Sequence, residues 1–296
     1  MKILITGGSG LLGSKIAAIA TRKGHEVYSG YKEHEVIHGV PIELDICNKQ
    51  QVIKAFDRIK PQAVVHAAAL TNVDKCEEDQ KLAWRVNVEG TRSVLESSES
   101  HNAFFFYVST DYVFSGEEGM YKELDRPDPI NYYGLTKYEA ENVVRDSPIE
   151  WCVARPSVIY GSLQAAGKIN FALWILNNLK QRKPIKIITN QWVSPTLNTN
   201  LAEMILEVIE RRLIGLYHLA GATTLNRYEF ASLIIEKFQY DKSLISPVKT
   251  DEMKWLAKRP RNTSLNVEKA VKILRVKPLK IHQALNKLKK EIEINS

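Results

Sequence analysis

Lys2-Ile-Leu-Ile-Thr6 followed by Gly7-Gly-Ser-Gly-Leu-Leu-Gly13 is the stretch of sequence that decides the fold. Its first five residues form an apolar run of strand length, and its glycines open a helical pattern over Leu12–Arg22. One glycine allows the tight reversal from strand to helix, another lets the backbone approach a pyrophosphate, and Gly13 lets the helix pack on the sheet. The unpaired N–H groups at such a helix start attract phosphate. The stretch therefore predicts a dinucleotide-binding strand–helix unit.

Strand and helix patterns alternate through the first half of the chain. The next expected strands are Glu26–Gly30, Val40–Asp45, Ala63–Ala69, Ala103–Thr110 and one within Glu150–Tyr160, and the helices between them are Lys49–Ile59, Gln80–His101 and Asn131–Arg145. This alternation predicts an α/β fold: a Rossmann-like, doubly wound parallel sheet with helices on both faces. The later half is less regular, and we expect it to form a smaller, interleaved C-terminal substrate lobe. The dinucleotide-binding domain is predicted over 1–160, with 190–222 packed against it, and the substrate lobe over 161–189 and 223–296.

The composition is that of an ordinary globular protein with a basic excess. The 296 residues are 44% hydrophobic and 25% charged, and the formal net charge is +7. Part of this charge gathers before and within the C-terminal helix. It is interpreted either as a solvated basic face or as attraction for an anionic ligand such as a dinucleotide or a diphospho-sugar. Because nucleic-acid-binding motifs are missing, we expect no nucleic-acid partner.

The cysteines and the N-terminus bear on the cellular compartment. Cys47, Cys76 and Cys152 stand far apart without metal-ligand spacing, so we expect neither a disulfide framework nor a metal site. The first residues lack a signal-peptide pattern, and no apolar run reaches membrane-spanning length. The sequence thus predicts a cytoplasmic protein without a membrane partner, and it leaves a homodimer open.

Cofactor contacts are expected where the first four strands end. The candidate residues come from the glycine turn, the tips of the second and third strands, the end of the fourth strand and the catalytic helix: Gly7, Gly10, Leu11, Leu12, Gly13, Tyr31, Lys32, Asp45, Ile46, Ala67, Ala68, Ala69, Tyr133 and Lys137. Asp45 could accept a hydrogen bond from the adenine amino group, or it could be a turn residue. The three alanines either let the cofactor lie against the backbone or serve close packing.

The tip of the second strand bears on which nicotinamide cofactor is used. NAD enzymes usually carry a carboxylate there for the ribose 2′-hydroxyl, whereas this chain reads Ser29-Gly-Tyr-Lys32. Lys32 could neutralise a 2′-phosphate, or it could be a solvated loop lysine. We therefore expect NADPH to be preferred. Glu33 lies near the offset of the usual carboxylate, so NADH stays open.

Tyr133-Gly-Leu-Thr-Lys137 carries the chemical signal. The tyrosine and the lysine lie one turn apart on a predicted helix and share one face. A cation so placed is expected to lower the phenol pKa from about 10 and so to suit the tyrosine for proton transfer. A strand-end hydroxyl would polarise a carbonyl; we favour Thr110, with Ser109 as the alternative, because only one of two successive strand residues can face the site. With hydride from a nicotinamide, this set predicts a ketone reductase.

These residues resemble the extended short-chain dehydrogenase/reductases, and among them the dTDP-4-dehydrorhamnose reductase family, over essentially the whole chain. The similar segments are Thr6–Gly13, His66–Glu77, Ser109–Phe114 and Tyr133–Lys137. The resemblance implies catalytic roles for Thr110, Tyr133 and Lys137. It also implies reduction of the 4-keto group of a nucleotide-diphospho-6-deoxy-sugar, most specifically of dTDP-4-dehydrorhamnose to dTDP-rhamnose.

Later segments resemble the family's sugar-nucleotide-binding lobe, which implies further substrate contacts. The substrate-binding candidates are Asp111, Tyr112, Asn170, Arg259 and Arg261. Arginine suits bidentate contact with a diphosphate, although the two arginines could equally be surface charges beside a proline turn.

Two features distinguish among relatives. Sugar-nucleotide 4,6-dehydratases carry Thr-Asp-Glu where this chain has Thr110-Asp-Tyr112, which argues against dehydration. The reductases usually show a tryptophan near the position of Ser157, and its replacement is a departure from their pattern. The tip ending in Lys32 and the segment 190–192 are similar to a regulatory relative, the NADP-binding β subunit of methionine adenosyltransferase. That subunit is the first alternative, and a nucleotide-sugar epimerase is the second.

Overall fold

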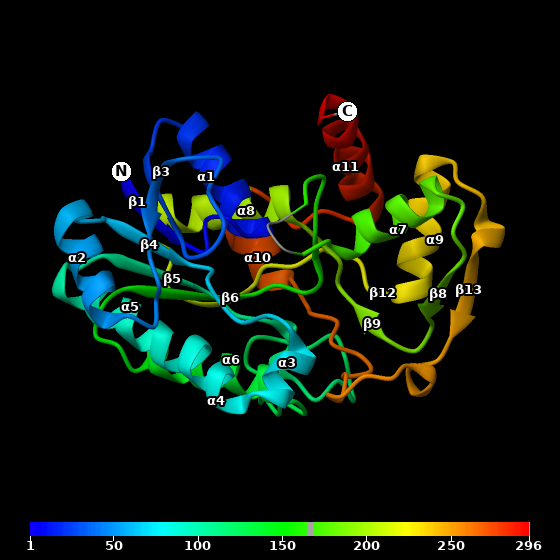
Figure 1. The fold of residues 1–296 in the computed structure, drawn as a ribbon, viewed down its shortest axis with the longest axis horizontal. Helices are drawn as coiled ribbons and strands as arrows, with labels where there is room; N and C mark the ends of the chain where they lie inside the picture. Colours follow the sequence, from blue (N-terminus) through cyan, green and yellow to red (C-terminus); the bar gives the residue numbers. More distant parts are fainter. Residues whose placement is uncertain (165–167, 296) are drawn as a thin grey trace.

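Seven parallel strands form the central sheet of the computed structural model, which describes residues 1–164 and 168–295 (Figure 1). The strands are β1 (Lys2–Thr6), β2 (Glu26–Tyr31), β3 (Val40–Glu43), β4 (Ala63–His66), β5 (Phe104–Val108), β6 (Trp151–Arg155) and β11 (Gly215–His218). Their spatial order is β11-β6-β5-β4-β1-β2-β3. The strand order reverses between β1 and β4, the place where such sheets bind ligands. The predicted Rossmann-like fold class is confirmed.

Helices cover both faces of this sheet, as the alternation of strand side chains requires. In Figure 1, α1 (Leu11–Arg22) and α8 (Asn198–Glu210) lie above the sheet, and α5 (Gly90–Ser100) and α6 (Tyr132–Arg145) lie below it. Ile3 and Ile5 of β1 pack in the cluster with α1 and α8, whereas Leu4 packs in the cluster with α5, α6 and α2 (Lys49–Ile59).

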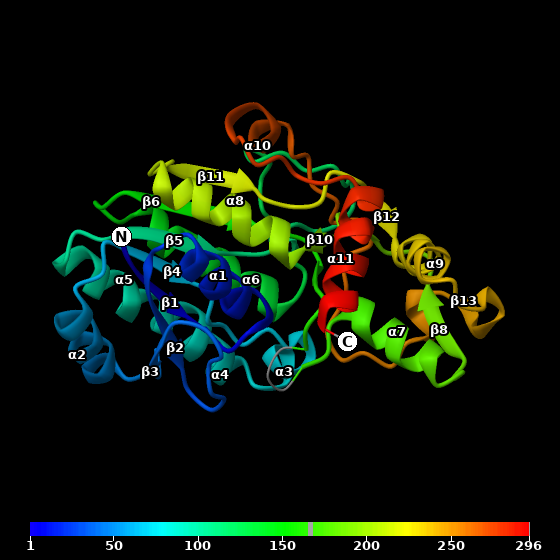
Figure 2. The same cartoon turned by 90° about the horizontal axis from the view of Figure 1, so that it is seen from above.

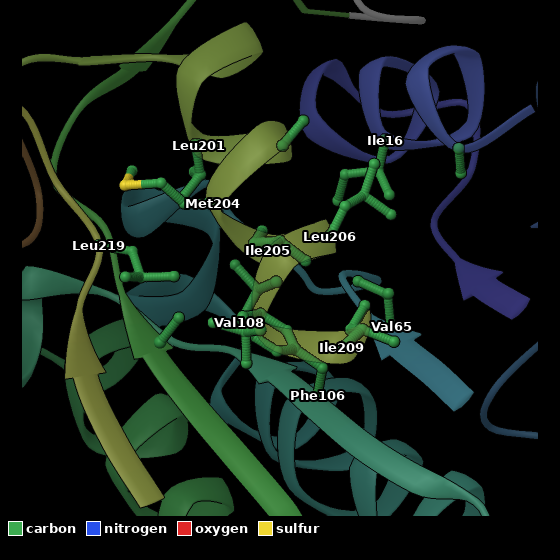
Figure 3. Close-up of a cluster of buried hydrophobic side chains, with 14 of the residues drawn as sticks. Ile16, Val65, Phe106, Val108, Leu201, Met204, Ile205, Leu206, Ile209 and Leu219 are labelled. Carbon is green, nitrogen blue, oxygen red and sulfur yellow. The ribbon is translucent and has the colours of Figure 1, made fainter. Parts of the chain in front are cut away.

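Helix α8 supplies much of the core on the upper face. Figure 3 shows Leu201, Ile205 and Ile209 of this helix beside Phe106 of β5 and Ile16 of α1, and all five are buried. Burying a side chain of this size stabilises the fold by about 1.5–3 kcal/mol. This helix belongs to the later half of the sequence. The later half therefore contributes to the core of the central sheet.

A second lobe stands at the right of Figures 1 and 2 and has its own core. It is built from α7 (Phe171–Lys180), β8 (Ile185–Ile188), α9 (Arg227–Phe238), β13 (Ile245–Val248) and α11 (Ile281–Asn295). Strands β8 and β13 pair in parallel. Residues 165–167 of the predicted lobe lie outside the described residues. Helix α10 (Glu268–Ile273) falls in the sequence range predicted for the lobe, yet its Ala270 packs in the core of the central sheet.

Short strands and turns join the two parts. They are β7 (Ile159–Tyr160) paired with β10 (Thr196–Leu197), and β9 (Trp192–Val193) paired with β12 (Leu225–Asn226). One 3-10 turn follows β5 at Asp111–Val113, and two flank β13 at Lys242–Leu244 and Thr250–Glu252. Every helix within 1–164 and 168–295 is too short or too polar to cross a bilayer.

The long helix expected over Gln80–His101 is wrong in detail. The chain forms α3 (Val73–Glu78), α4 (Gln80–Trp84), a π-helical turn at Arg85–Glu89 and then α5. The turn carries the Asn87 side chain inward. Its amide oxygen accepts a hydrogen bond from the Leu70 N–H, and its amide nitrogen donates to the Leu70 carbonyl oxygen and to the Thr136 hydroxyl. The extra residue of the π-helical turn places Asn87 where it can satisfy the backbone N–H and carbonyl groups of the loop at Leu70.

The fourth strand also ends earlier than expected, at His66 instead of Ala69. Its partner β1 ends opposite it, at Thr6, where the chain enters the glycine turn. Residues 67–69 therefore leave the sheet on the same edge as that turn.

Candidate active site

The glycine turn is shaped by close backbone approach. Gly7 has a φ of +70°, and a Cβ there would lie 2.9 Å from the Ala68 backbone. A Cβ at Gly13 would lie 2.2 Å from the Gly7 carbonyl oxygen. Only glycine meets both demands, so the turn stays next to the ends of β1 and β4.

Helix α1 begins directly behind this turn with a free N-terminus. Its N-cap is Gly10, and no side chain of the described residues caps it. The N–H groups of Leu11, Leu12 and Gly13 have no intrahelical partners, and the helix dipole adds partial positive charge. This is the cradle that a cofactor pyrophosphate requires.

The tips of β2 and β3 bring together the residues predicted at the adenosine end. Lys32 Nζ lies 3.0 Å from Asp45 Oδ2, and the lysine side chain is 58% exposed. The hydrogen bond to Asp45 raises the pKa of Lys32. Tyr31 ends β2, and Ile46 is buried against Gly90. The structure therefore pairs two residues that were expected to contact different parts of the cofactor.

The predicted catalytic helix is α6, and a close contact fixes its start. Asn131 caps it by accepting a hydrogen bond from the Gly134 N–H at 2.8 Å. A Cβ at Gly134 would lie 2.2 Å from the Tyr112 carbonyl oxygen. A residue larger than glycine would push Tyr133 away from the Thr110 segment.

Lys137 is buried and points at the end of β5. Its Nζ donates a hydrogen bond to the Val108 carbonyl oxygen at 2.7 Å and lies 4.2 Å from the centre of the Tyr107 ring. Burial lowers the pKa of Lys137 to about 7, and the nearby charge of Glu141 opposes this shift.

The expected lowering of the Tyr133 pKa is wrong for the protein without cofactor. Burial raises the pKa of the Tyr133 phenol above its ordinary value, and a side-chain hydrogen bond with Thr110 opposes this shift. The physical reason is that the Lys137 ammonium group is held at Val108 and Tyr107, so it does not neutralise the phenolate.

The two hydroxyls after β5 point to different partners. The Thr110 side chain lies near enough to the Tyr133 phenol to oppose the rise of its pKa, and Thr110 Oγ1 accepts from the Tyr112 N–H at 3.2 Å. Ser109 Oγ donates to Glu141 Oε1 at 2.5 Å, inside the core. The strand therefore presents Thr110 to the tyrosine and turns Ser109 away.

The carboxylate of Asp111 already accepts hydrogen bonds from other side chains of the protein. It is buried, and its Oδ2 accepts hydrogen bonds from Ser157 Oγ at 2.7 Å and from Thr263 Oγ1 at 2.5 Å. Burial raises the pKa of this carboxyl. Ser157 thus anchors the segment that carries Thr110.

The other substrate candidates are placed differently. The Tyr112 ring lies 6.0 Å from the Tyr133 ring, edge to face, whereas Asn170 caps α7 by accepting from the Leu173 N–H at 3.2 Å. Arg259 Nη2 lies 2.9 Å from Asp74 Oδ2, and the Arg259 side chain is 9% exposed. Arg261 is exposed.

Two features near the site escaped the sequence-based expectations. Burial raises the pKa of Tyr112, and the nearby positive charge of Arg227 on α9 opposes this shift. Glu141 forms a buried ion pair with Arg155. Glu141 lies one turn beyond Lys137 on α6, so the helical period could have indicated it; Arg227 carries no local signal beyond its place after the helix cap Asn226.

The pKa of Lys137 predicts a pH-dependent stability. Below pH 7 the lysine is protonated both folded and unfolded, so folding bears the full cost of burying the charge. Between pH 7 and its ordinary pKa of 10.5 only the unfolded chain keeps the proton, so stability rises with pH. We expect wild type to gain about 1.4 kcal/mol per pH unit relative to Lys137→Met over this range.

Urea unfolding of the cofactor-free protein at pH 6, 7.5 and 9 measures this difference. The exposed Lys81 provides a control, since Lys81→Met is expected to track wild type at every pH. Parallel curves for wild type and Lys137→Met would contradict the lowered pKa.

Within the described residues, no group of three or more His, Cys, Asp or Glu side chains could hold a metal ion. The three cysteines are free thiols.

Comparison with known proteins gives matches over the whole chain. The family model described as RmlD substrate binding domain matches residues 1–294. A dTDP-4-dehydrorhamnose reductase of Aggregatibacter actinomycetemcomitans is 30% identical over 97% of this chain and 98% of that protein. Methionine adenosyltransferase 2 subunit beta of Xenopus tropicalis is 30% identical over 92% of this chain and 82% of that protein.

A solved structure adds a match in three dimensions. The dTDP-4-dehydrorhamnose reductase of Bacillus anthracis in complex with NADP has a TM-score of 0.89 and is 29% identical, covering 98% of this chain and 99% of that chain.

Proposed function

The chain belongs to the RmlD substrate binding domain family, one of the extended short-chain dehydrogenase/reductases, and we propose that it is an NADPH-dependent sugar-nucleotide reductase. It reduces the 4-keto group of a nucleotide-diphospho-6-deoxy-sugar, most specifically dTDP-4-dehydrorhamnose to dTDP-rhamnose. The observation that carries the proposal is the convergence of Thr110, Tyr133 and Lys137 beside the uncapped glycine turn. Residues 1–160 with 190–222 hold the cofactor, and 161–189 with 223–296 hold the sugar nucleotide.

The residues present fit a nicotinamide dinucleotide. A Cβ would fill the close approach at Gly7, and the first turn of α1 offers its N–H groups to phosphate. When bound, the reduced nicotinamide supplies a hydride to the sugar carbonyl carbon.

The chain's own residues manage the proton. The Thr110 hydroxyl orients the carbonyl oxygen, and the nearby Tyr133 phenol donates a proton to that oxygen. Lys137 lies one turn along the same face of α6, and in the protein alone its ammonium group is held at Val108 and Tyr107. With the cofactor bound, this ammonium group would favour the phenolate left behind. Thr110 and Lys137 are buried and Tyr133 is half-buried, which limits exchange of the proton with bulk water.

A turnover assay separates this proposal from the alternatives. Mixing the protein with dTDP-4-dehydrorhamnose and NADPH should lower the absorbance of the reduced nicotinamide. A nucleotide-sugar epimerase would leave that absorbance unchanged while altering the sugar. A regulatory subunit would do neither, and a pull-down with methionine adenosyltransferase would then test that role, which the similar Xenopus protein supports.

Lys32→Ala is expected to weaken NADPH binding by about 1–3 kcal/mol and to leave NADH binding nearly unchanged. The lysine is half-exposed beside Asp45 at the tip of β2, where the adenosine ribose would lie. Titration calorimetry with each cofactor measures the two affinities. Equal losses for both would show that Lys32 does not contact the 2′-phosphate.

Asp45→Asn is the matched control for this pair. It removes the carboxylate beside the expected 2′-phosphate and leaves the Lys32 charge in place, so the ratio of NADPH to NADH affinity should hold or rise. A fall in that ratio would assign the preference to the intact Asp45–Lys32 pair.

We further propose that the protein acts in the cytoplasm and forms a homodimer. The free cysteines support a reducing compartment. Sedimentation equilibrium tests the dimer, because a monomer mass at micromolar concentration would contradict it.

A further inference from the structure

Arg227 reaches from the second lobe to the catalytic segment. It is the first residue of α9, and its N–H donates to the Gln191 carbonyl oxygen at 3.0 Å. Its guanidinium carbon lies 5.1 Å from the centre of the Phe171 ring. Its positive charge acts on Tyr112 and Asp111 of the catalytic segment. The Tyr112 ring in turn lies 6.0 Å from the Tyr133 ring, so this cation is placed near the proton donor.

The charge of Arg227 is not neutralised by an ion pair. Among residues 1–164 and 168–295, no carboxylate oxygen lies within 4.0 Å of its guanidinium group, unlike Arg155 and Arg259, which have such partners. Asp111 influences it from farther away, and the oxygens of that carboxylate already accept hydrogen bonds from Thr110, Ser157 and Thr263. A half-buried arginine without a counter-ion is suited to an anionic ligand.

We propose that Arg227 binds the diphosphate of the sugar-nucleotide substrate, an inference that rests on the proposed function. With the sugar carbonyl at Tyr133, the diphosphate lies one sugar ring away, on the side of the site where Tyr112 and Arg227 meet. The guanidinium fork supplies paired N–H donors to phosphate oxygens. Its location on α9 lets the second lobe bind the substrate while the first lobe carries out the chemistry.

The arginines predicted from the sequence are less free to do this. Arg259 would have to leave Asp74 at 2.9 Å and the Ala257 carbonyl oxygen at 3.0 Å. Arg261 is exposed, and its backbone carbonyl oxygen accepts from the Trp192 N–H at 2.7 Å. They serve as comparison positions in the test.

The test measures binding of dTDP, which carries the diphosphate without the sugar, by titration calorimetry in the presence of NADP. Arg227→Gln should raise the dTDP dissociation constant and the substrate KM by about ten- to a hundredfold. The turnover number kcat should stay within about twofold, since a remote contact acts equally in ground and transition states. Arg227→Lys should recover part of the affinity, and Arg261→Gln should lose less affinity than Arg227→Gln. An equal or larger loss in Arg261→Gln would place the diphosphate at Arg261 instead.

Tyr112→Phe separates direct binding from a structural role. It removes the hydroxyl on which the charge of Arg227 acts and keeps the cation, so dTDP affinity should stay near that of wild type. If Tyr112→Phe loses as much dTDP affinity as Arg227→Gln, then Arg227 acts only by holding Tyr112 and the inference is overturned. NADP affinity, unchanged in every variant, reports that the fold is intact.

The same data keep this inference apart from the proposed function. Wild-type turnover with equal dTDP affinity in wild type and Arg227→Gln would overturn the inference alone. Arg227-dependent dTDP binding without wild-type turnover would support the binding site and reject the reductase. Absence of both turnover and dTDP binding in wild type would reject both.

Discussion

Tyr133→Phe is expected to lower kcat by about a hundred- to ten-thousandfold, because it removes only the proton donor. Its phenol lies near Thr110, on the face of α6 that also carries Lys137. The affinity for NADPH should stay within about twofold, since Phe keeps the ring that packs against Tyr112. The decrease in nicotinamide absorbance measures turnover, and quenching of protein fluorescence measures cofactor binding.

Tyr132→Phe provides the matched control on the same helix. Tyr132 is the neighbouring residue, and its backbone N–H donates to Glu77 Oε2 at 3.0 Å. Removing this hydroxyl should leave kcat unchanged. Near-normal turnover in Tyr133→Phe would exclude Tyr133 as the acid, and an equal loss in both variants would point to a disturbed helix start.

Glu141→Gln should lower the free energy of unfolding by about 3–5 kcal/mol, because it leaves Arg155 charged and unpaired in the core. The two side chains are at most 1% exposed, and Arg155 donates to Glu141 through Nε at 2.9 Å and Nη2 at 2.6 Å. Arg155 Nη1 already lacks a hydrogen-bond partner among the described residues. Urea unfolding at pH 7 measures the loss.

Two controls isolate the buried charge. The double variant Glu141→Leu with Arg155→Met removes both charges and should recover most of the loss, since a buried pair adds little over apolar packing. Glu150→Gln breaks the half-exposed pair with Arg212 and should cost less than about 1 kcal/mol. A similarly small loss in Glu141→Gln would show that water reaches Arg155.

The glycine turn and the catalytic helix were predictable because their geometry is local. Gly7 and Gly13 lie in one turn, where the positive φ of Gly7 and the close approach of Gly13 to the Gly7 carbonyl oxygen require glycine. Tyr133 and Lys137 share a face of their helix because they are four residues apart. The helix break at Arg85–Glu89 was not predictable in this way. It depends on Asn87 finding Leu70 and Thr136, which are 17 and 49 residues away in sequence.

The sequence by itself therefore determined the sheet, the cofactor turn and the order of the catalytic residues, since strand and helix periods act between near neighbours. Only the tertiary structure decided which charges are already paired. Arg259 meets Asp74 across 185 residues, Lys32 meets Asp45, and Arg227 is left facing Tyr112. The physical reason is that the interaction energy of two charged side chains depends on their distance and burial in the folded chain. The local sequence pattern determines neither quantity.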